Sequence, residues 1–356
     1  MSEAQALVKL GVEELASAPQ GIKGFHMAIA KRAFDGVGPA ALPVRVAHDA
    51  ISGAVYGGLS QATRFGGRAL EAAIGRRYTQ QLSETPGGAA MIAIINGLVG
   101  DTLAEQRNEL AKPMTERVSG TPTPRITVFL HGLMETDFSW GREPNYGSRL
   151  AEEAGWTPVY VRYNTGLRIS QNGRSLAQLL ERTVSDWPVD VEEIALIGHS
   201  MGGLVCRSAA YRAAEDRMSW VKHVSHVVSL GTPHRGAPLE EIVHVGSAAL
   251  NALPETQGIA RFLRRRSGGI RDLRRGSLVD EDWQDRDPDA LRASACQEIP
   301  LLEGAKHCFV SATGDLLVLG RSSAPWRDEE ACTVKGGHFA LLNHPQVYER
   351  LRGWLA

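Results

Sequence analysis

The feature that most constrains the fold is an alternation, from residue 125 onward, of short apolar runs with longer amphipathic segments. The runs are nearly continuous in apolar character, which is typical of strands buried on both faces of a parallel sheet. They cover residues 126–130, 158–162, 194–197, 224–230, 308–311 and 332–334, and examples of the amphipathic segments are 175–187, 204–214 and 346–355. The sequence therefore predicts an α/β fold with a mostly parallel sheet between layers of helices.

The N-terminal third has a different texture. Residues 1–121 are rich in Ala and Gly, and their apolar residues recur at helical spacing, so we expect a helical extension with no apolar strand of the kind found after residue 125. The prolines in residues 121–124 favour an extended joint, and a single domain is expected over 122–356. Within it, the long interruption at about 237–300 predicts a helical cap.

Composition and charge exclude several classes of protein. The 39 Lys and Arg nearly balance the 40 Asp and Glu, whereas a protein that binds nucleic acid needs a basic excess. Residues 1–5 lack the charged and apolar regions of a signal peptide, and the apolar run 87–100 is shorter than a membrane span. The four cysteines show no metal-ligand spacing and no CxxC pair. A cytoplasmic protein with reduced thiols is expected.

The apolar run 194–197 leads directly into Gly198-His199-Ser200-Met201-Gly202, and a helical segment follows. In this strand–turn–helix context the G-x-S-x-G pattern predicts a nucleophile elbow, which exposes the hydroxyl of Ser200 on a sharp turn. Gly198 and Gly202 leave room where a Cβ would collide with the neighbouring strand and helix. The positive end of the following helix also faces the reacting centre.

Acyl transfer also needs two backbone N–H donors for the oxyanion of the tetrahedral intermediate. One is expected from Met201, the residue after the nucleophile, and the other from Leu133, in the loop after the run 126–130. His131 opens the same loop. A histidine at a strand end often only bonds its loop, and that interpretation stays open for His131.

A serine nucleophile needs a base and an orienting acid, in the chain order Ser, acid, His for this kind of sheet. Asp315 lies just beyond the run 308–311, and His338 follows two glycines after the run 332–334. We expect His338 to be the base and His344 to be a loop or cap residue at the start of the last helix. A turn aspartate that bonds its own backbone is the alternative for Asp315.

Four motifs carry a resemblance to a known family: His131-Gly132-Leu133, the segment 162–166, the segment 198–203 and the segment 230–236. Residues 125–356 resemble the bacterial triacylglycerol lipase/esterase branch of the α/β-hydrolases, and are similar to the PGAP1-like lipases that deacylate glycosylphosphatidylinositol. Asp315-Leu316-Leu317-Val318 resembles the Asp-Gly-Leu-Val acid loop of that family, with Leu316 in place of Gly. His234 lies in a turn common to such lipases and is expected near the cap.

These features together predict a serine carboxylester hydrolase that acts on lipophilic esters through Ser200, His338 and Asp315. Such chemistry needs no metal or organic cofactor, and the acidic segment 285–296 lacks the Gly and Glu of a calcium loop. An acyltransferase or thioesterase with the same triad, and an inactive protein that binds lipid or membrane, remain the alternatives. The N-terminal helices leave open a homo-oligomer, an acyl pocket or peripheral membrane contact.

Overall fold

The computed structural model describes the chain at residues 2–3, 5–6, 81–143, 145–237, 267–285, 296–315, 317–318, 320–323 and 330–356. The chain divides into two compact units. One contains residues 1–88, 107–110 and 242–265, and the other contains residues 89–106, 111–241 and 266–356. Residues 1, 4 and 7–80 of the predicted helical extension at 1–121 lie outside the described residues, as do residues 238–266 and 286–295 of the predicted cap at about 237–300.

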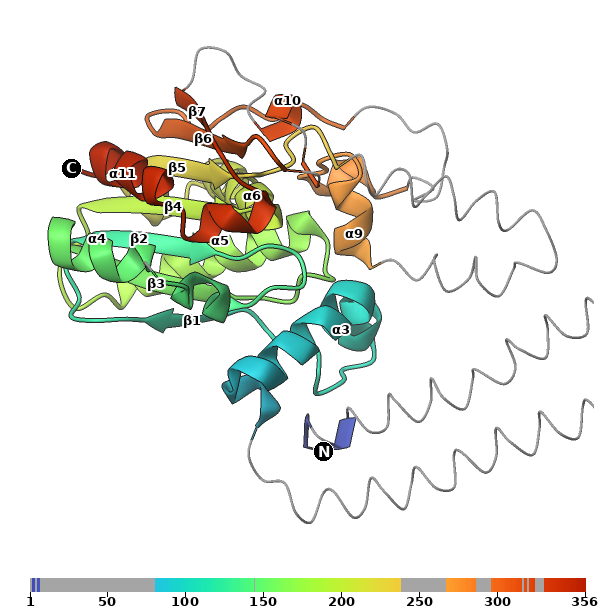
Figure 1. Cartoon of the computed structure of the whole chain (residues 1–356). Helices are drawn as coiled ribbons and strands as arrows, with labels where there is room; N and C mark the ends of the chain where they lie inside the picture. Colours follow the sequence, from blue (N-terminus) through green and yellow to red (C-terminus); the bar gives the residue numbers. More distant parts are fainter. Residues whose placement is uncertain are drawn as a thin grey trace, which may run out of the picture. The chain divides into compact units, whose positions relative to one another are not determined.

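The second unit is built on a seven-stranded sheet in the order β1-β3-β2-β4-β5-β6-β7. All neighbours are parallel except β1 and β3, which are antiparallel (Figure 1). The strands are β1 (Thr115–Val118), β2 (Arg125–Leu130), β3 (Trp156–Arg162), β4 (Glu193–His199), β5 (Val224–Leu230), β6 (Lys306–Ala312) and β7 (Glu330–Val334). Each of the six predicted apolar runs lies within one of β2 to β7, so the expected parallel sheet is confirmed.

One strand, β1, lies within the segment 1–121, where the sequence predicted helices only. β1 is an edge strand that pairs with β3, with Thr115 opposite Arg162. All four of its residues are exposed, and their sequence, Thr-Glu-Arg-Val, has no apolar run. An edge strand needs backbone partners on one side only, so its sequence carries little of the apolar signal of a buried strand.

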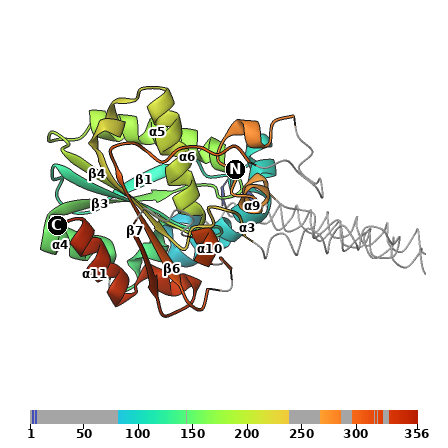
Figure 2. The same cartoon turned by 90° about the horizontal axis from the view of Figure 1, so that it is seen from above.

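Helices cover both faces of the sheet (Figures 1 and 2). One face carries α5 (Ile169–Ser185) and α6 (Met201–Glu215), and the other carries α4 (Tyr146–Ala154) and α11 (Pro345–Trp354). Shorter helices are α9 (Gly268–Leu273), α10 (Gly320–Ser323), η2 (Leu82–Glu84), η3 (Asp137–Gly141), η4 (Ser219–His223), η6 (Asp280–Asp282) and η7 (His338–Leu342). The predicted segments 175–187, 204–214 and 346–355 correspond to α5, α6 and α11, and their C-terminal ends agree within two residues. At the N-terminal ends, α5 begins six residues and α6 three residues earlier than predicted.

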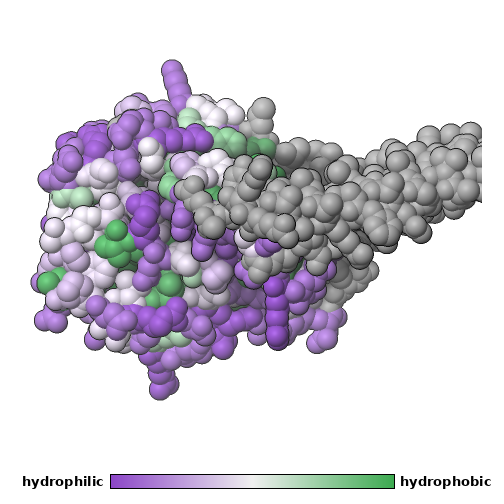
Figure 3. Space-filling view, turned by 90° about the horizontal axis from the view of Figure 1, so that it is seen from below, coloured by the Kyte–Doolittle hydropathy of each residue, from purple (hydrophilic) through white to green (hydrophobic). Residues whose placement is uncertain are grey.

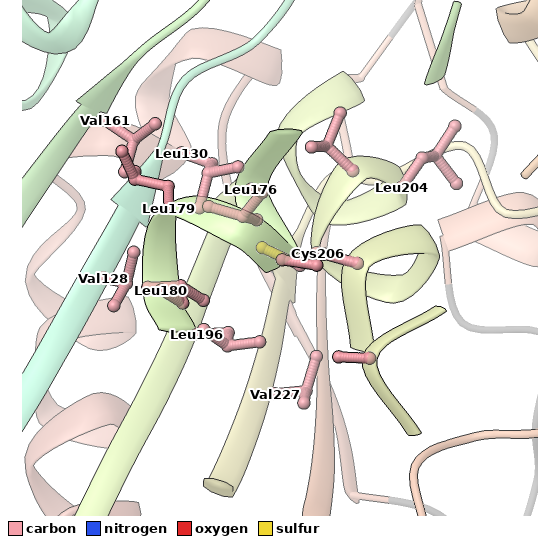
Figure 4. Packing of buried hydrophobic residues seen from close by; sticks show 14 of the residues in the cluster. Val128, Leu130, Val161, Leu176, Leu179, Leu180, Leu196, Leu204, Cys206 and Val227 are labelled. Carbon is pink, nitrogen blue, oxygen red and sulfur yellow. The ribbon is translucent and has the colours of Figure 1, made fainter. Parts of the chain in front are cut away.

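Two apolar clusters hold these layers together. Val128 and Leu196 point to the α5–α6 side, where they pack with Leu176 and other residues (Figure 4). Their chain neighbours Phe129 and Ile197 belong to the opposite cluster, on the α4–α11 side. Successive strand residues face opposite sides, so strands with both faces buried must be apolar throughout. This explains why the runs predicted the strands so well.

α3 (Pro86–Glu105) precedes the sheet and is the one described helix that is long and apolar enough, by length and composition alone, to cross a membrane. The prediction that this segment is too short to do so is therefore wrong. One side of α3 packs within the second unit, where the Gly100 carbonyl accepts a hydrogen bond from Asn164 Nδ2 at 2.9 Å. The other side exposes Met91, Ile94 and Leu98.

On the face of the chain shown in Figure 3, the coloured residues are mostly hydrophilic, with small separate hydrophobic patches.

Candidate active site

The order of the strands sets where a site can form. After β2 the chain passes to β3 on one side, and β4 then pairs with β2 on its other side. In open α/β sheets, ligands bind outside the carboxyl ends of the strands at this kind of switch point. Leu130 pairs with Gly198, so the ends of β2 and β4 lie next to each other. The loop that begins at His131 and the turn that contains Ser200 therefore meet at this edge.

Ser200 occupies a strained turn between β4 and α6. Its φ of 52° and ψ of −121° are rare for a residue other than glycine. Its N–H donates a hydrogen bond to the carbonyl oxygen of Leu230 at 2.8 Å, which ties the turn to the end of β5. A Cβ at Gly202 would overlap the carbonyl of Leu130, and a Cβ at Gly198 would overlap the backbone of Gly203. The glycines thus give the room that the predicted elbow requires.

Asp315 and His338 are hydrogen-bonded to each other. Oδ2 of Asp315 lies 2.7 Å from Nδ1 of His338, and both side chains are buried. Oδ1 of Asp315 accepts hydrogen bonds from the N–H groups of Leu317 and Val318, at 2.9 and 2.8 Å. Burial alone would raise the pKa of Asp315, but these bonds and His338 lower it below its ordinary value. An ionised Asp315 fixes the proton of His338 on Nδ1 and leaves the Nε2 lone pair available as a base.

Neighbouring strands bring the acid and the base together. Asp315 follows β6 and His338 follows β7, and the two strands are paired in parallel. The N–H of Gly314 donates to the carbonyl oxygen of Gly336 at 2.8 Å, which joins the two loops just before each functional residue. The alternative interpretation, in which Asp315 bonds only the backbone of its own turn, accounts for one carboxylate oxygen. The other oxygen is bonded to His338.

The loop that carries His338 lies against the elbow. Nε2 of His199 is 3.2 Å from the carbonyl oxygen of His338, and the two rings have centroids 4.7 Å apart. A Cβ on Gly231, the residue after Leu230, would lie 3.2 Å from Nδ1 of His338. No hydrogen bond joins the hydroxyl of Ser200 to His338 within the described residues. Catalytic hydrogen bonds of this kind are often long without substrate.

The two expected oxyanion donors follow two neighbouring strands, β2 and β4. Leu133 follows β2, and Met201 is the first residue of α6. Residues 132–135 form a tight turn, in which the N–H of Glu135 donates to the carbonyl oxygen of Gly132 at 3.2 Å. A Cβ on Gly132 would lie 3.1 Å from Cβ of Ser200, so this turn is in close contact with the elbow. Within the described chain neither Leu133 N–H nor Met201 N–H donates a hydrogen bond to another group.

Three further histidines have structural partners. His131 is buried and stacks on Tyr163, and burial lowers its pKa, as expected for a histidine that holds its own loop. His234 lies within hydrogen-bonding distance of Arg207, at 3.3 Å, and burial together with Arg207 lowers its pKa well below the ordinary value. His344 caps α11 by accepting a hydrogen bond from Gln346 N–H, so its assignment as a cap residue is confirmed.

Two charged groups beside Ser200 were given no chemical role by the sequence. Oε2 of Glu135 lies 3.1 Å from Nδ1 of His199 and 2.8 Å from the N–H of Gly132. The only sequence signal is an acidic residue three positions after the glycine of the loop. Of the segment 285–289 only Asp285 is described, and among the described residues of the chain no group of three or more His, Cys, Asp or Glu is suited to a metal.

Comparison with known proteins agrees with this architecture. The family described as "PGAP1-like alpha/beta domain" matches residues 172–284. The propeptide form of the Bacillus licheniformis lipase BlEst2 superposes with a TM-score of 0.50 at 18% identity, over 68% of this chain and 54% of the lipase. Its mature form gives a TM-score of 0.48 at 18% identity, over 69% of this chain and 99% of that one. A thermophilic esterase from Thermogutta terrifontis superposes with a TM-score of 0.44 at 14% identity, over 68% of this chain and 92% of the esterase.

The chain spans about half the length of the propeptide form of the lipase. No curated protein matches it. The sheet order, the crossing helices and the strained serine turn define an α/β-hydrolase fold, as the sequence predicted. Residues 172–284 of the chain are similar to the PGAP1-like domain, and the fold is similar to that of the Bacillus licheniformis lipase.

Proposed function

We propose that this protein is a serine carboxylester hydrolase whose nucleophile is Ser200. The observation that carries the proposal is the 2.7 Å hydrogen bond between Asp315 and His338, on loops that lie against the strained turn of Ser200. A histidine that is oriented by a buried carboxylate, on a loop beside a serine in a strained turn, is the arrangement that activates a serine hydroxyl. The lipase and esterase neighbours support the same class of reaction.

The first half of the reaction forms an acyl-enzyme. Oγ of Ser200 attacks the ester carbonyl carbon while Nε2 of His338 accepts the hydroxyl proton. Asp315 keeps the other proton on Nδ1 and stabilises the imidazolium that forms. The negative oxygen of the tetrahedral intermediate is bound by the N–H groups of Leu133 and Met201, and His338 then protonates the departing alcohol.

The second half releases the acid. A water molecule attacks the acyl carbon, His338 accepts its proton, and Ser200 leaves as the restored hydroxyl. The negative charge again develops on the carbonyl oxygen, so the same two N–H groups stabilise it. Each proton that leaves Ser200 or water passes through His338, which explains why a single oriented histidine is enough for both steps.

We expect the substrate to be a lipophilic ester. The exposed side of α3 carries Met91, Ile94 and Leu98, and the packed side of the same helix meets Met134, in the turn that follows Leu133. An apolar helix therefore borders the turn that carries Leu133, and its exposed side offers a surface for an acyl chain or a lipid. The predicted cap would supply further apolar contacts, but residues 238–266 lie outside the described residues.

A fluorophosphonate probe tests the proposal, because it reacts only with an activated serine. We expect one equivalent of label on the peptide that contains Ser200, identified by mass spectrometry, and no label in Ser200→Ala. A series of p-nitrophenyl esters from acetate to palmitate then gives the preferred chain length, and product analysis with added alcohols or thioesters separates hydrolysis from acyl transfer. A folded wild-type protein that takes no label would overturn the assignment.

A further inference from the structure

Glu135 and His199 form a buried pair beside the nucleophile. Their side chains are only 9% and 1% exposed, and Oε2 of Glu135 lies 3.1 Å from Nδ1 of His199. The same oxygen accepts a hydrogen bond from the N–H of Gly132 at 2.8 Å. Glu135 comes from the loop after β2 and His199 from the last position of β4, so the pair joins the oxyanion loop to the elbow.

The partners of His199 determine its charge. Nδ1 faces the carboxylate of Glu135, and Nε2 faces the carbonyl oxygen of His338 at 3.2 Å. A carbonyl oxygen and an ionised carboxylate can only accept hydrogen bonds, so both ring nitrogens of His199 must donate. A histidine with two N–H groups is the imidazolium cation. The geometry therefore describes an ion pair of Glu135 and His199.

Burial makes this pair expensive to break. Burial alone would raise the pKa of Glu135, but His199 and the Gly132 N–H lower it to about 2. Burial alone would lower the pKa of His199, but the charge and hydrogen bond of Glu135 raise it above the ordinary value. A buried charge that loses its partner is strongly destabilising, so each group holds the other in place.

The pair contacts three loops that the reaction needs in register. Gly132 belongs to the turn that presents Leu133, His199 precedes Ser200, and the carbonyl bound by His199 belongs to His338. The carboxylate of Glu135 accepts a hydrogen bond from the N–H of Gly132 and so holds this turn in place. The same turn determines the direction of the next N–H, which belongs to Leu133. A displacement of about 1 Å at such a donor is enough to slow a reaction about a hundred-fold.

We propose that Glu135 is a positioning residue of the active site: its ion pair with His199 fixes the oxyanion loop, the elbow and the His338 loop relative to one another. Among the described residues, Glu135 makes no hydrogen bond to the hydroxyl of Ser200 or to the ring of His338, and it acts through Gly132 and His199. The inference rests on the proposed ester hydrolase, since a positioning role has meaning only for a reaction at Ser200.

The first arm of the test does not depend on activity. Nitrogen-15 NMR of histidine-labelled protein reports the protonation of each ring nitrogen, and His199→Gln assigns the signal. We expect His199 to be doubly protonated at pH 7 in the wild type and singly protonated in Glu135→Gln. A neutral His199 in the wild type would overturn the ion pair, whatever the outcome for the proposed function.

The second arm measures catalysis per active site, counted by fluorophosphonate titration. For Glu135→Gln we expect kcat to fall about 10- to 100-fold, KM to stay within about twofold, and the inhibition constant of a trifluoromethyl ketone to rise in parallel with the loss of kcat. This ketone forms a tetrahedral adduct with an oxyanion on Ser200, so its affinity reports the oxyanion donors. If folded wild-type protein took no fluorophosphonate label, the proposed function itself would be wrong.

Asp137 provides the matched control. It is a second buried carboxylate two residues further on, paired with Arg162 at 2.6 Å and Arg117 at 3.3 Å. We expect Asp137→Asn to lower the melting temperature but to leave kcat per titrated site within about twofold. Unchanged kcat and inhibition constant in folded Glu135→Gln would overturn the positioning role. If Glu135→Gln does not fold, His199→Gln removes the same pair and is measured in the same way.

Discussion

Nδ1 of His338 lies 2.7 Å from Oδ2 of Asp315, although the two residues are 23 positions apart in the chain. The contact exists because β6 and β7 are parallel neighbours, so their carboxyl ends open on the same edge of the sheet. The β4 end, which carries Ser200, opens on that edge too. The direction of the strands thus gathers three residues that lie on separate segments of the sequence.

Replacing Ser200 with Ala should abolish ester hydrolysis without unfolding the protein. Loss of the nucleophile typically lowers turnover about a million-fold. Ser200 also stays in a positive-φ conformation, which alanine tolerates less well than glycine, so Ser200→Gly is a useful companion variant. Hydrolysis of p-nitrophenyl butyrate and a thermal melt measure the two properties. Either variant retaining more than about a hundredth of wild-type turnover would contradict the role of Ser200.

The two histidines near the C-terminus should differ sharply. His338→Ala removes the base and should be as damaging as Ser200→Ala, because members of a triad act as a unit. His344 only caps α11 and bonds the carbonyl of Lys335, so His344→Ala should cost about 0.5–2 kcal/mol of stability and little turnover. Steady-state kinetics and urea unfolding on both variants check this. An inactive His344→Ala with an active His338→Ala would reverse the assignment of the base.

Asp315→Asn should leave the fold intact and slow the reaction about ten-thousand-fold. The amide donates where the carboxylate accepts, so it favours the tautomer of His338 with its proton on Nε2, which cannot take the proton of Ser200. The N–H bonds from Leu317 and Val318 can still be accepted by the amide oxygen. Activity near that of the wild type would point to a different carboxylate.

The strands were predictable from the sequence, and the residues of the proposed triad were suggested by it, for related reasons. Strands such as β4, with Leu196 on one face and Ile197 on the other, are apolar throughout because both faces are buried. Candidate catalytic residues then follow the strand ends in chain order, which is why the sequence suggested Ser200, Asp315 and His338. The structure does bring Asp315 and His338 together, whereas the bond between Ser200 and His338 stays a prediction.

Two other features, the strand β1 and the pair of Glu135 and His199, could not be predicted from a single sequence. β1 is fully exposed and gains its place from backbone pairing with β3, which any residues of moderate β propensity can provide. The pair of Glu135 and His199 depends on two loops 64 residues apart meeting at one point. Neither residue has a neighbour in sequence that would reveal the partner, so only the arrangement of β2 and β4 shows it.

The stability of the protein should depend on pH through Glu135. Its pKa in the folded state is lowered from 4.5 to about 2, because His199 and the Gly132 N–H outweigh the effect of burial. A lowered folded pKa contributes stability that is present above pH 4.5 and is lost as the pH falls through about 2. Urea unfolding should show wild type more stable than Glu135→Gln by about 1–3 kcal/mol at pH 6, with the difference shrinking toward pH 2. The exposed Glu349→Gln should show almost no difference at either pH.

The elbow should tolerate no side chain at Gly202, and α11 provides the comparison. A Cβ at Gly202 would overlap the carbonyl oxygen of Leu130 and approach that of His131, so Gly202→Ala must push the start of α6 away from the end of β2. We expect a loss of about 1–3 kcal/mol, typical of overpacking, and a marked fall in kcat because the N–H of Met201 moves with the helix.

In Gly353→Ala the new Cβ meets nothing within 4 Å and lies inside α11. That variant should gain up to about 1 kcal/mol, since alanine has the higher helix propensity, and should keep full activity. Urea unfolding and p-nitrophenyl ester kinetics on the two variants measure these effects side by side. If Gly202→Ala were as stable and as active as Gly353→Ala, the close approach of α6 to β2 would have no part in shaping the turn of Ser200.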